Sequence, residues 1–120
     1  MRPPAWVDGV FAAVDSKDAA RFAACIAEDG EFVFGNAPPV RGRAAIEAAV
    51  AGFFGTIRAC RHRLAHFWQD GEACAMHGTV TYTRLDGGEV TLPFANAFAM
   101  RGPLIAQYRI FVDVAPLYAA

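Results

Sequence analysis

The sequence has little charge of either sign and almost no net charge. Lys and Arg together number 11 and Asp and Glu 12 among 120 residues, so charged residues make up 19% of the chain and the formal net charge is -1. Proteins that bind nucleic acid or acidic lipid generally carry a strong positive field, and we therefore expect neither partner. The arginines of the middle segment are too sparse to change this expectation: Arg41, Arg43, Arg58, Arg61 and Arg63.

Long apolar runs and paired cysteines are also lacking. No stretch reaches the roughly 18–20 consecutive apolar residues of a membrane-spanning helix, and Asp8 interrupts any apolar leader near the N-terminus. We therefore expect no membrane partner and a cytoplasmic location. Cys25, Cys60 and Cys74 are odd in number and widely spaced, which predicts buried, reduced thiols and no metal site.

What the chain does have is apolar residues, which make up 55% of the sequence. A chain of this size can bury roughly two-thirds of the surface that it exposes when unfolded. This composition excludes intrinsic disorder. With no repeat or linker along its length, residues 1–120 are predicted to form one domain.

The first half of the chain is predicted to hold three helices and one short strand. Apolar residues at i, i+3, i+4 and i+7 from Val7 predict a helix over residues 7–14. A second helix is expected from a cap at Ser16 or Asp18 to an exit at residues 28–30. A strand at 31–34, a loop at 35–39 and a third helix at 43–54 follow.

The second half is predicted to be a meander of four strands. The turn sequences at 70–71, 86–88 and 101–103 are rich in Asp and Gly, and they divide the segment into strands at about 60–69, 72–85, 89–100 and 104–114. Strands this long coil strongly. The pattern predicts an α+β fold, with three N-terminal helices packed on a strongly curved, mostly antiparallel sheet and a cavity between them.

Three segments carry a resemblance to a known family: residues 13–29, the run PPVRGRAAI that leads into the third helix, and the run YRIFVD at 108–113. They resemble the nuclear-transport-factor-2-like superfamily, and within it the SnoaL-like domains, which are related to ketosteroid isomerases and limonene-epoxide hydrolases. The resemblance implies a cone-shaped fold and a homodimer packed through the open face of the sheet. It leaves function open, because this fold serves isomerases, cyclases, hydrolases and binding subunits.

The catalytic residues of those relatives are mostly replaced. Val10 and Phe34 stand where ketosteroid isomerases have a Tyr donor and an Asp base. Of the Asp-Arg-Asp set of the epoxide hydrolases, the chain keeps Asp113, with Asn96 and Phe94 at the other two positions.

Asp113 is therefore the first candidate for a general base, since burial beside apolar residues would raise its pKa. The alternative is a structural Asp that pairs with Arg109 or caps a backbone N–H. On a strand, Asp113 would point to the same face as Phe111, and Tyr108 and Ile110 to the opposite face. Either face could line the cavity, so the orientation of Asp113 stays open.

Asn96 and His66 complete the catalytic candidates. Asn96 interrupts an apolar alternation, so a buried amide there needs a partner, either a neighbour or a ligand. His66 would be a proton carrier, or else a surface or interface residue. His62 and His66 are not expected to share a metal ion, because four residues of a strand span roughly 13 Å.

Aromatic side chains could form an apolar cup for a small ligand, although core packing explains most of them equally well. The expected substrate-binding residues are Trp68, Phe34, Phe11, Phe54, Tyr82, Phe98 and Tyr108. Two functions remain open. One is an isomerase, cyclase or hydrolase that uses general acid/base chemistry on a small apolar substrate without cofactor or metal; the other is a non-catalytic ligand-binding or dimerisation module.

Overall fold

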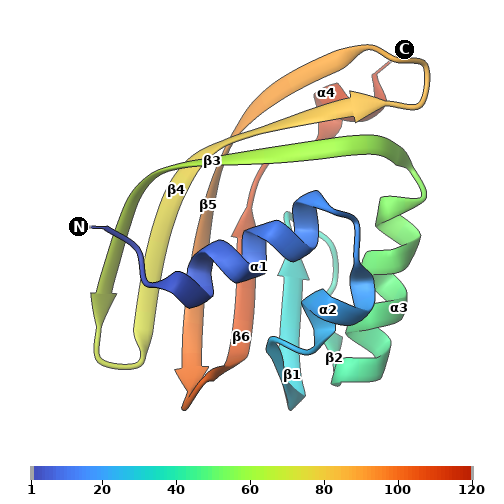
Figure 1. The fold of residues 1–120 in the computed structure, drawn as a ribbon. Helices are drawn as coiled ribbons and strands as arrows, with labels where there is room; N and C mark the ends of the chain where they lie inside the picture. Colours follow the sequence, from blue (N-terminus) through green and yellow to red (C-terminus); the bar gives the residue numbers. More distant parts are fainter. Residues whose placement is uncertain (1, 120) are drawn as a thin grey trace.

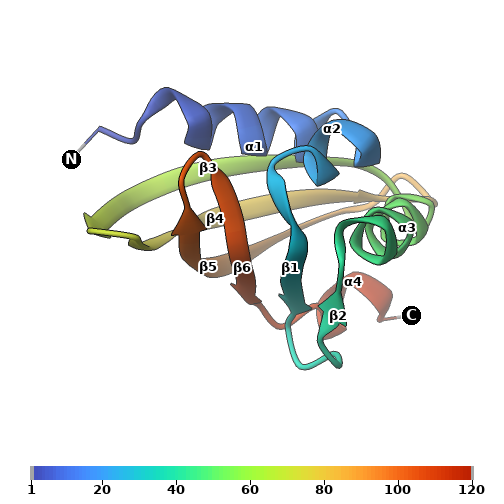
Figure 2. The same ribbon diagram turned by 90° about the horizontal axis from the view of Figure 1, so that it is seen from below.

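A six-stranded sheet curls around the helices in the computed structural model, which describes residues 2–119 (Figure 1). The sheet and helices lie in two layers, and Figure 2 shows α1 and α2 along one side of the curled sheet, with α3 at one end. In chain order the elements are α1 (Ala5–Asp15), α2 (Ala19–Ala23), β1 (Ile26–Phe34), β2 (Val40–Arg41), α3 (Arg43–Phe54), β3 (Ile57–Asp70), β4 (Ala73–Arg84), β5 (Glu89–Arg101), β6 (Leu104–Phe111) and α4 (Ala115–Tyr118).

The strand order confirms the predicted fold class. The order is β2-β1-β6-β5-β4-β3, so β3 to β6 form the expected antiparallel meander. Among the strands of the described residues, only β1 and β6 pair in parallel. The three long hairpins hold the meander together, and β3 is left as an edge strand.

Several element boundaries differ from those predicted. The second helix ends at Ala23 and β1 begins at Ile26, because Ile26 and Ala27 are buried and Ile26 pairs with Ile105 of β6. Strand β6 ends at Phe111. The residues after it include the short helix α4, which the sequence analysis missed.

The core fills the space between the helices and the inner face of the sheet. Alternate residues of β4 and β5 are buried, as a sheet covered on one face requires. At its centre, the Phe22 ring of α2 lies 5.2 Å from the Tyr108 ring and 5.8 Å from the Phe32 ring, both edge-on. These contacts fix α2 on strands β1 and β6.

A β-bulge in β3 decides which side chains face the core. Leu64 pairs with Gly78 and His66 pairs with His77, so β3 has one residue more than β4 between these two pairs. An extra residue reverses the alternation. Cys60 and His62 therefore point inward before the bulge, whereas His66 is exposed beyond it.

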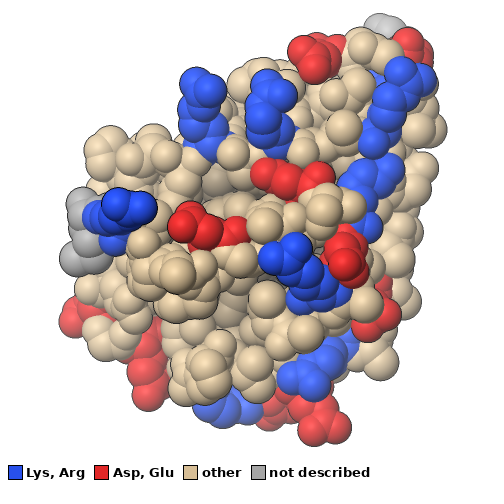
Figure 3. Space-filling model, in the orientation of Figure 1, with Lys and Arg blue, Asp and Glu red and all other residues tan. Residues whose placement is uncertain are grey.

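The charged side chains do not gather in one patch on the face shown in Figure 3, where uncharged atoms predominate and Lys and Arg lie among Asp and Glu. Among residues 2–119, no helix has both the length and the apolar character needed to cross a bilayer.

Substitution of Gly78 by Ala tests the bulge. A Cβ atom at Gly78 would lie 2.0 Å from the Arg63 carbonyl oxygen and 2.9 Å from the Leu64 Cα, so β3 and β4 would have to separate. We expect Gly78→Ala to lower the free energy of unfolding by about 1–3 kcal/mol, measured by urea denaturation.

Gly9→Ala is the matched control. Gly9 lies within α1 and has no atom within 4 Å of an added Cβ, so the substitution should stabilise the helix by about 0.5–1 kcal/mol. Equal effects at the two glycines would show that the close approach at the bulge is not a constraint.

Candidate functional site

A cavity of about 210 Å³ lies between the helices and the inner face of the sheet. Its wall is almost entirely apolar: Phe32 and Phe34 come from β1, Val50 and Phe53 from α3, and Ile110 from β6. The few polar groups on this wall are therefore the candidates for chemistry. They belong to His62, Asn96, Tyr82 and Tyr108.

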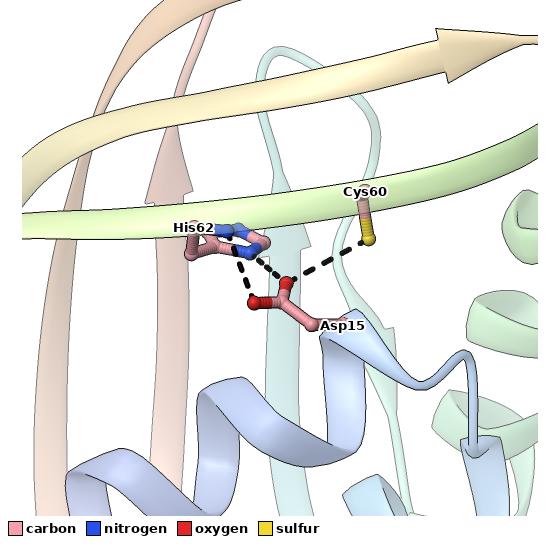
Figure 4. Close-up of side chains that lie close together, drawn as sticks. All are labelled: Asp15, Cys60 and His62. Carbon is pink, nitrogen blue, oxygen red and sulfur yellow. Dashed lines mark hydrogen bonds and ion pairs between the residues drawn. The ribbon is translucent and has the colours of Figure 1, made fainter.

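His62 is held by a carboxylate from the end of α1. Its Nδ1 lies 2.6 Å from Asp15 Oδ1, and its backbone N–H donates to Asp15 Oδ2 at 3.0 Å. Figure 4 shows Asp15, the last residue of α1, with its side chain directed toward β3. β3 is an edge strand, so no further strand accepts hydrogen bonds from its outer side. Asp15 accepts the bond from the His62 backbone N–H there.

The imidazole ring is fixed on its faces as well. Its centroid lies 5.0 Å from that of Phe11 and 5.2 Å from that of Phe94. The side chain of His62 is only 12% exposed. The ring thus has one orientation, in which Asp15 engages Nδ1 and Nε2 makes no hydrogen bond to the described residues.

Cys60 lies beside this pair as a buried free thiol. Its Sγ is 3.4 Å from the Val14 carbonyl oxygen and 3.9 Å from Asp15 Oδ1. Burial, and then the nearby Asp15 carboxylate, raise the pKa of the Cys60 thiol to about 12. The group is therefore a protonated thiol at neutral pH, and not a nucleophile.

The trio of Asp15, Cys60 and His62 has the donor types of a metal site, with ligand atoms within 4.8 Å of one another. One feature opposes that interpretation. The 2.6 Å contact between Asp15 and His62 is that of a direct hydrogen bond, which a shared metal ion would have to replace. The geometry is that of a hydrogen-bonded dyad.

Asn96 lies on the cavity wall with an unsatisfied atom. The residue is 3% exposed, and its Oδ1 has no hydrogen-bond partner among residues 2–119. Burial strongly raises the pKa of Tyr108, and a smaller opposing effect comes from a hydrogen bond of the Asn96 side chain. Asn96 is thus the buried amide that the sequence analysis expected to need a partner.

Most of the expected substrate-binding residues reach the cavity. Phe34, Phe54, Tyr82 and Tyr108 line it. Phe11 and Phe98 are buried but do not line it, and Phe11 instead packs on His62. Trp68 is 53% exposed.

Two of the catalytic candidates do not reach the cavity. His66 is exposed on the outer sheet face, stacked on Trp68 at 5.5 Å, because the bulge turns both outward. Asp113 is exposed, and its Oδ1 accepts the Ala115 N–H at the start of α4. Of the two faces left open for the last strand, the one with Tyr108 and Ile110 lines the cavity.

The sequence analysis missed Asp15 and His62 as a pair. They lie 47 residues apart, and Asp15 directly follows the first helix as it was predicted, over residues 7–14. One local signal was available. A carboxylate in the last turn of a helix is unfavourable beside the helix dipole, so an Asp at that place calls for a partner.

Residues 7–108 match the SnoaL-like domain family. The chain belongs to this family. The resemblance stated from the sequence is therefore confirmed. No curated protein matches the sequence.

Solved structures share the fold at low sequence identity. A protein with a ketosteroid isomerase-like fold from Catenulispora acidiphila, in complex with trimethylamine, has a TM-score of 0.88 at 16% identity, over 97% of this chain and 91% of that one. A putative polyketide cyclase from Pseudomonas putida has a TM-score of 0.73 at 22% identity, over 90% and 89% of the two chains. An epoxide hydrolase of the limonene-epoxide hydrolase type from M. tuberculosis has a TM-score of 0.78 at 16% identity, over 93% and 83%.

The buried thiol makes a prediction about alkaline stability. Above pH 9, the ordinary pKa of a thiol, Cys60 ionises in the unfolded chain but stays protonated in the folded chain up to its pKa of about 12. The folded state then binds more protons, so the free energy of unfolding should fall as pH rises through this window. We expect the melting temperature, measured by circular dichroism, to decline from pH 9 upward.

Cys60→Ser should make this decline shallower, because a serine hydroxyl does not ionise and can still donate to the Val14 carbonyl. Burial also raises the pKa of Cys25, but this thiol is only half-buried, so Cys25→Ser should change the slope less. An equally steep decline in the Cys60→Ser protein would contradict the assignment.

Proposed function

We propose that this SnoaL-like protein is an enzyme that transfers a proton on a small, mostly apolar substrate, without cofactor or metal. The observation that carries the proposal is the Asp15–His62 dyad on the wall of an apolar cavity. A histidine that is fixed at Nδ1 and available at Nε2 has the arrangement of a general base. Such a base serves an isomerase, a cyclase or a hydrolase.

Each member of the dyad has a defined role in this chemistry. Nε2 of His62 accepts a proton from the substrate, and the ring becomes positively charged. Asp15 stabilises that charge and keeps the ring in the tautomer with a free Nε2. The apolar walls exclude water, which strengthens the attraction between the imidazolium and any negative charge that forms on the substrate.

The solved relatives support this reaction class at a coarse level. One is a putative polyketide cyclase and another an epoxide hydrolase. Both names describe chemistry on small molecules. Neither assigns a substrate here, because sequence identities of this size show a shared fold alone.

Substitution of the dyad tests the proposal with 5-nitrobenzisoxazole, a neutral bicyclic compound. A base removes its ring C–H proton, the N–O bond breaks, and a coloured cyano-nitrophenolate forms. We expect His62→Gln to lower kcat, followed by absorbance, by about 100-fold or more. Asp15→Asn should also lower kcat, because Asp15 no longer sets the tautomer.

His66→Gln and Asp113→Asn are the controls, since both side chains are exposed and lie outside the cavity wall. Both proteins should keep the rate of the unaltered chain. If His62→Gln also keeps that rate, the protein is better described as a non-catalytic ligand-binding module, which the apolar wall would equally suit.

We further propose that the outer face of the sheet is the interface of a homodimer. Trp68 and Phe111 are 53% and 57% exposed there, although both are large and apolar. The row of Trp68 continues through Ala75 and Ala97 to Arg109, and the row of Phe111 continues through Ala95 to His77. Exposed large apolar side chains that are bordered by polar residues are typical of an interface.

Light scattering tests the dimer. We expect a mass of about 26 kDa, twice the 12.9 kDa of the chain, and a shift toward monomer in Trp68→Glu, because a charge would be buried in the interface. Leu85→Glu is the matched control: Leu85 is 60% exposed but lies beyond the end of β4. A monomeric unaltered chain would refute the interface.

A further inference from the structure

Two imidazoles that the proposed reaction does not use lie together on the outer face of the sheet. His66 of β3 and His77 of β4 are cross-strand partners, and their ring centroids are 5.0 Å apart. We propose that these two side chains together bind one divalent transition-metal ion. The site lies on the opposite face of the sheet from the cavity, so the inference is independent of the proposed function.

The bulge in β3 creates the pair. Leu64 pairs with Gly78, so an unbroken register would place residue 65 opposite His77. The extra residue instead places His66 there, and both histidines are exposed on the same face. Residues that are directly opposite on antiparallel strands have Cβ atoms about 4.5–5.5 Å apart. The two rings are therefore held close together by the backbone of two paired strands.

The separation of the rings is the one that a shared ion requires. A metal–nitrogen bond to histidine is about 2.0–2.1 Å long, so two imidazoles bound side by side to one ion have ring centroids roughly 5 Å apart. The His66 and His77 ring planes are tilted by 34°. The Cβ–Cγ bond of histidine turns with little resistance, so a rotation of the exposed rings can direct one nitrogen of each toward the same ion.

Both imidazoles are accessible to an ion in solution. Both residues are exposed, and neither takes part in a salt bridge among residues 2–119. Water molecules can complete the coordination of the ion on the open side. Imidazole nitrogen suits Ni²⁺, Cu²⁺ and Zn²⁺, whereas Mg²⁺ prefers oxygen ligands. The site should therefore distinguish these two classes of cation.

Trp68 lies beside both imidazoles and makes the site observable. Its ring centroid is 5.5 Å from that of His66, on which it stacks, and 5.5 Å from that of His77. Paramagnetic Ni²⁺ quenches the fluorescence of an indole at short range. The sequence has one other tryptophan, Trp6, so a Trp6→Phe protein reports on Trp68 alone.

Titration with nickel chloride at neutral pH tests the inference on the chain without an affinity tag. We expect calorimetry of the unaltered chain to give one Ni²⁺ bound per chain, and the Trp68 fluorescence of the Trp6→Phe protein to fall over the same concentration range. Magnesium chloride should do neither. His66→Gln and His77→Gln should each weaken Ni²⁺ binding by about 100-fold or more, because the second bond of the ion is lost.

His62→Gln is the matched control, since it removes the third histidine of the chain and separates this site from the trio of Asp15, Cys60 and His62. This protein should bind Ni²⁺ as tightly as the unaltered chain does. Weaker binding in His62→Gln, or unchanged binding in His66→Gln and His77→Gln, would overturn the inference. Absence of Ni²⁺ binding in the unaltered chain, or equal binding of Mg²⁺, would overturn it as well.

The number of ions per chain separates this site from the proposed dimer. His77 belongs to the same cross-strand row as Phe111, so the histidine pair and the proposed interface share one face. Because both imidazoles come from one chain, one Ni²⁺ should bind per chain whether light scattering finds a monomer or a dimer. One ion for every two chains would mean that the ion bridges two copies, and it would overturn a site formed within one chain.

Discussion

The contact between Asp15 and His62 joins the end of α1 to the edge strand of the sheet. One carboxylate oxygen engages the imidazole and the other accepts the backbone N–H of the same residue. Lys17, two residues further along, adds a second link by donating to the carbonyl oxygens of Ile57 and Arg58. These bonds hold α1 against β3, and this wall of the cavity depends on them.

The position of Asp15 is unfavourable for the helix alone, because a negative charge at a helix C-terminus opposes the helix dipole. Lys17 has a φ of 58°, a left-handed conformation that non-glycine residues rarely adopt. Two locally unfavourable features in three residues need compensation from the surroundings. The contacts to β3 supply it, and departures from local rules of this kind concentrate at functional sites.

The elements could be predicted from the sequence because their signals are local. Alternation and Asp-Gly turns gave the four strands of the meander, and helical periodicity gave the first and third helices. The cavity wall was predicted to the extent that it follows strand alternation, as for Tyr82, Tyr108 and Asn96. The orientation of Asp113 stayed open because β6 ends at Phe111, where strand parity ceases to decide which way a side chain points; the stated alternative, a cap on a backbone N–H, matches its bond to Ala115.

The dyad could not be predicted because it depends on two non-local facts. The bulge opposite Gly78 separates the inward His62 from the outward His66 and Trp68, whereas unbroken alternation would put all three side chains on one face. The contact with Asp15 then depends on how α1 crosses the sheet, which no residue pattern encodes.

The same bulge determines which apolar side chains of β3 face the core and which face outward. On the inner face, aromatic side chains pack around a cavity that their own volume does not fill. On the outer face, Ala95 and His77 lie in the row that leads from Phe111 toward the side of Trp68, whose ring is 5.5 Å from that of His77. The apolar fraction of 55% therefore exceeds what the core alone requires.

If the bulge were lost, the residues of β3 beyond it would exchange faces: Phe67 would leave the core and Trp68 would enter it. The cavity and the proposed interface thus depend on the same extra residue in β3.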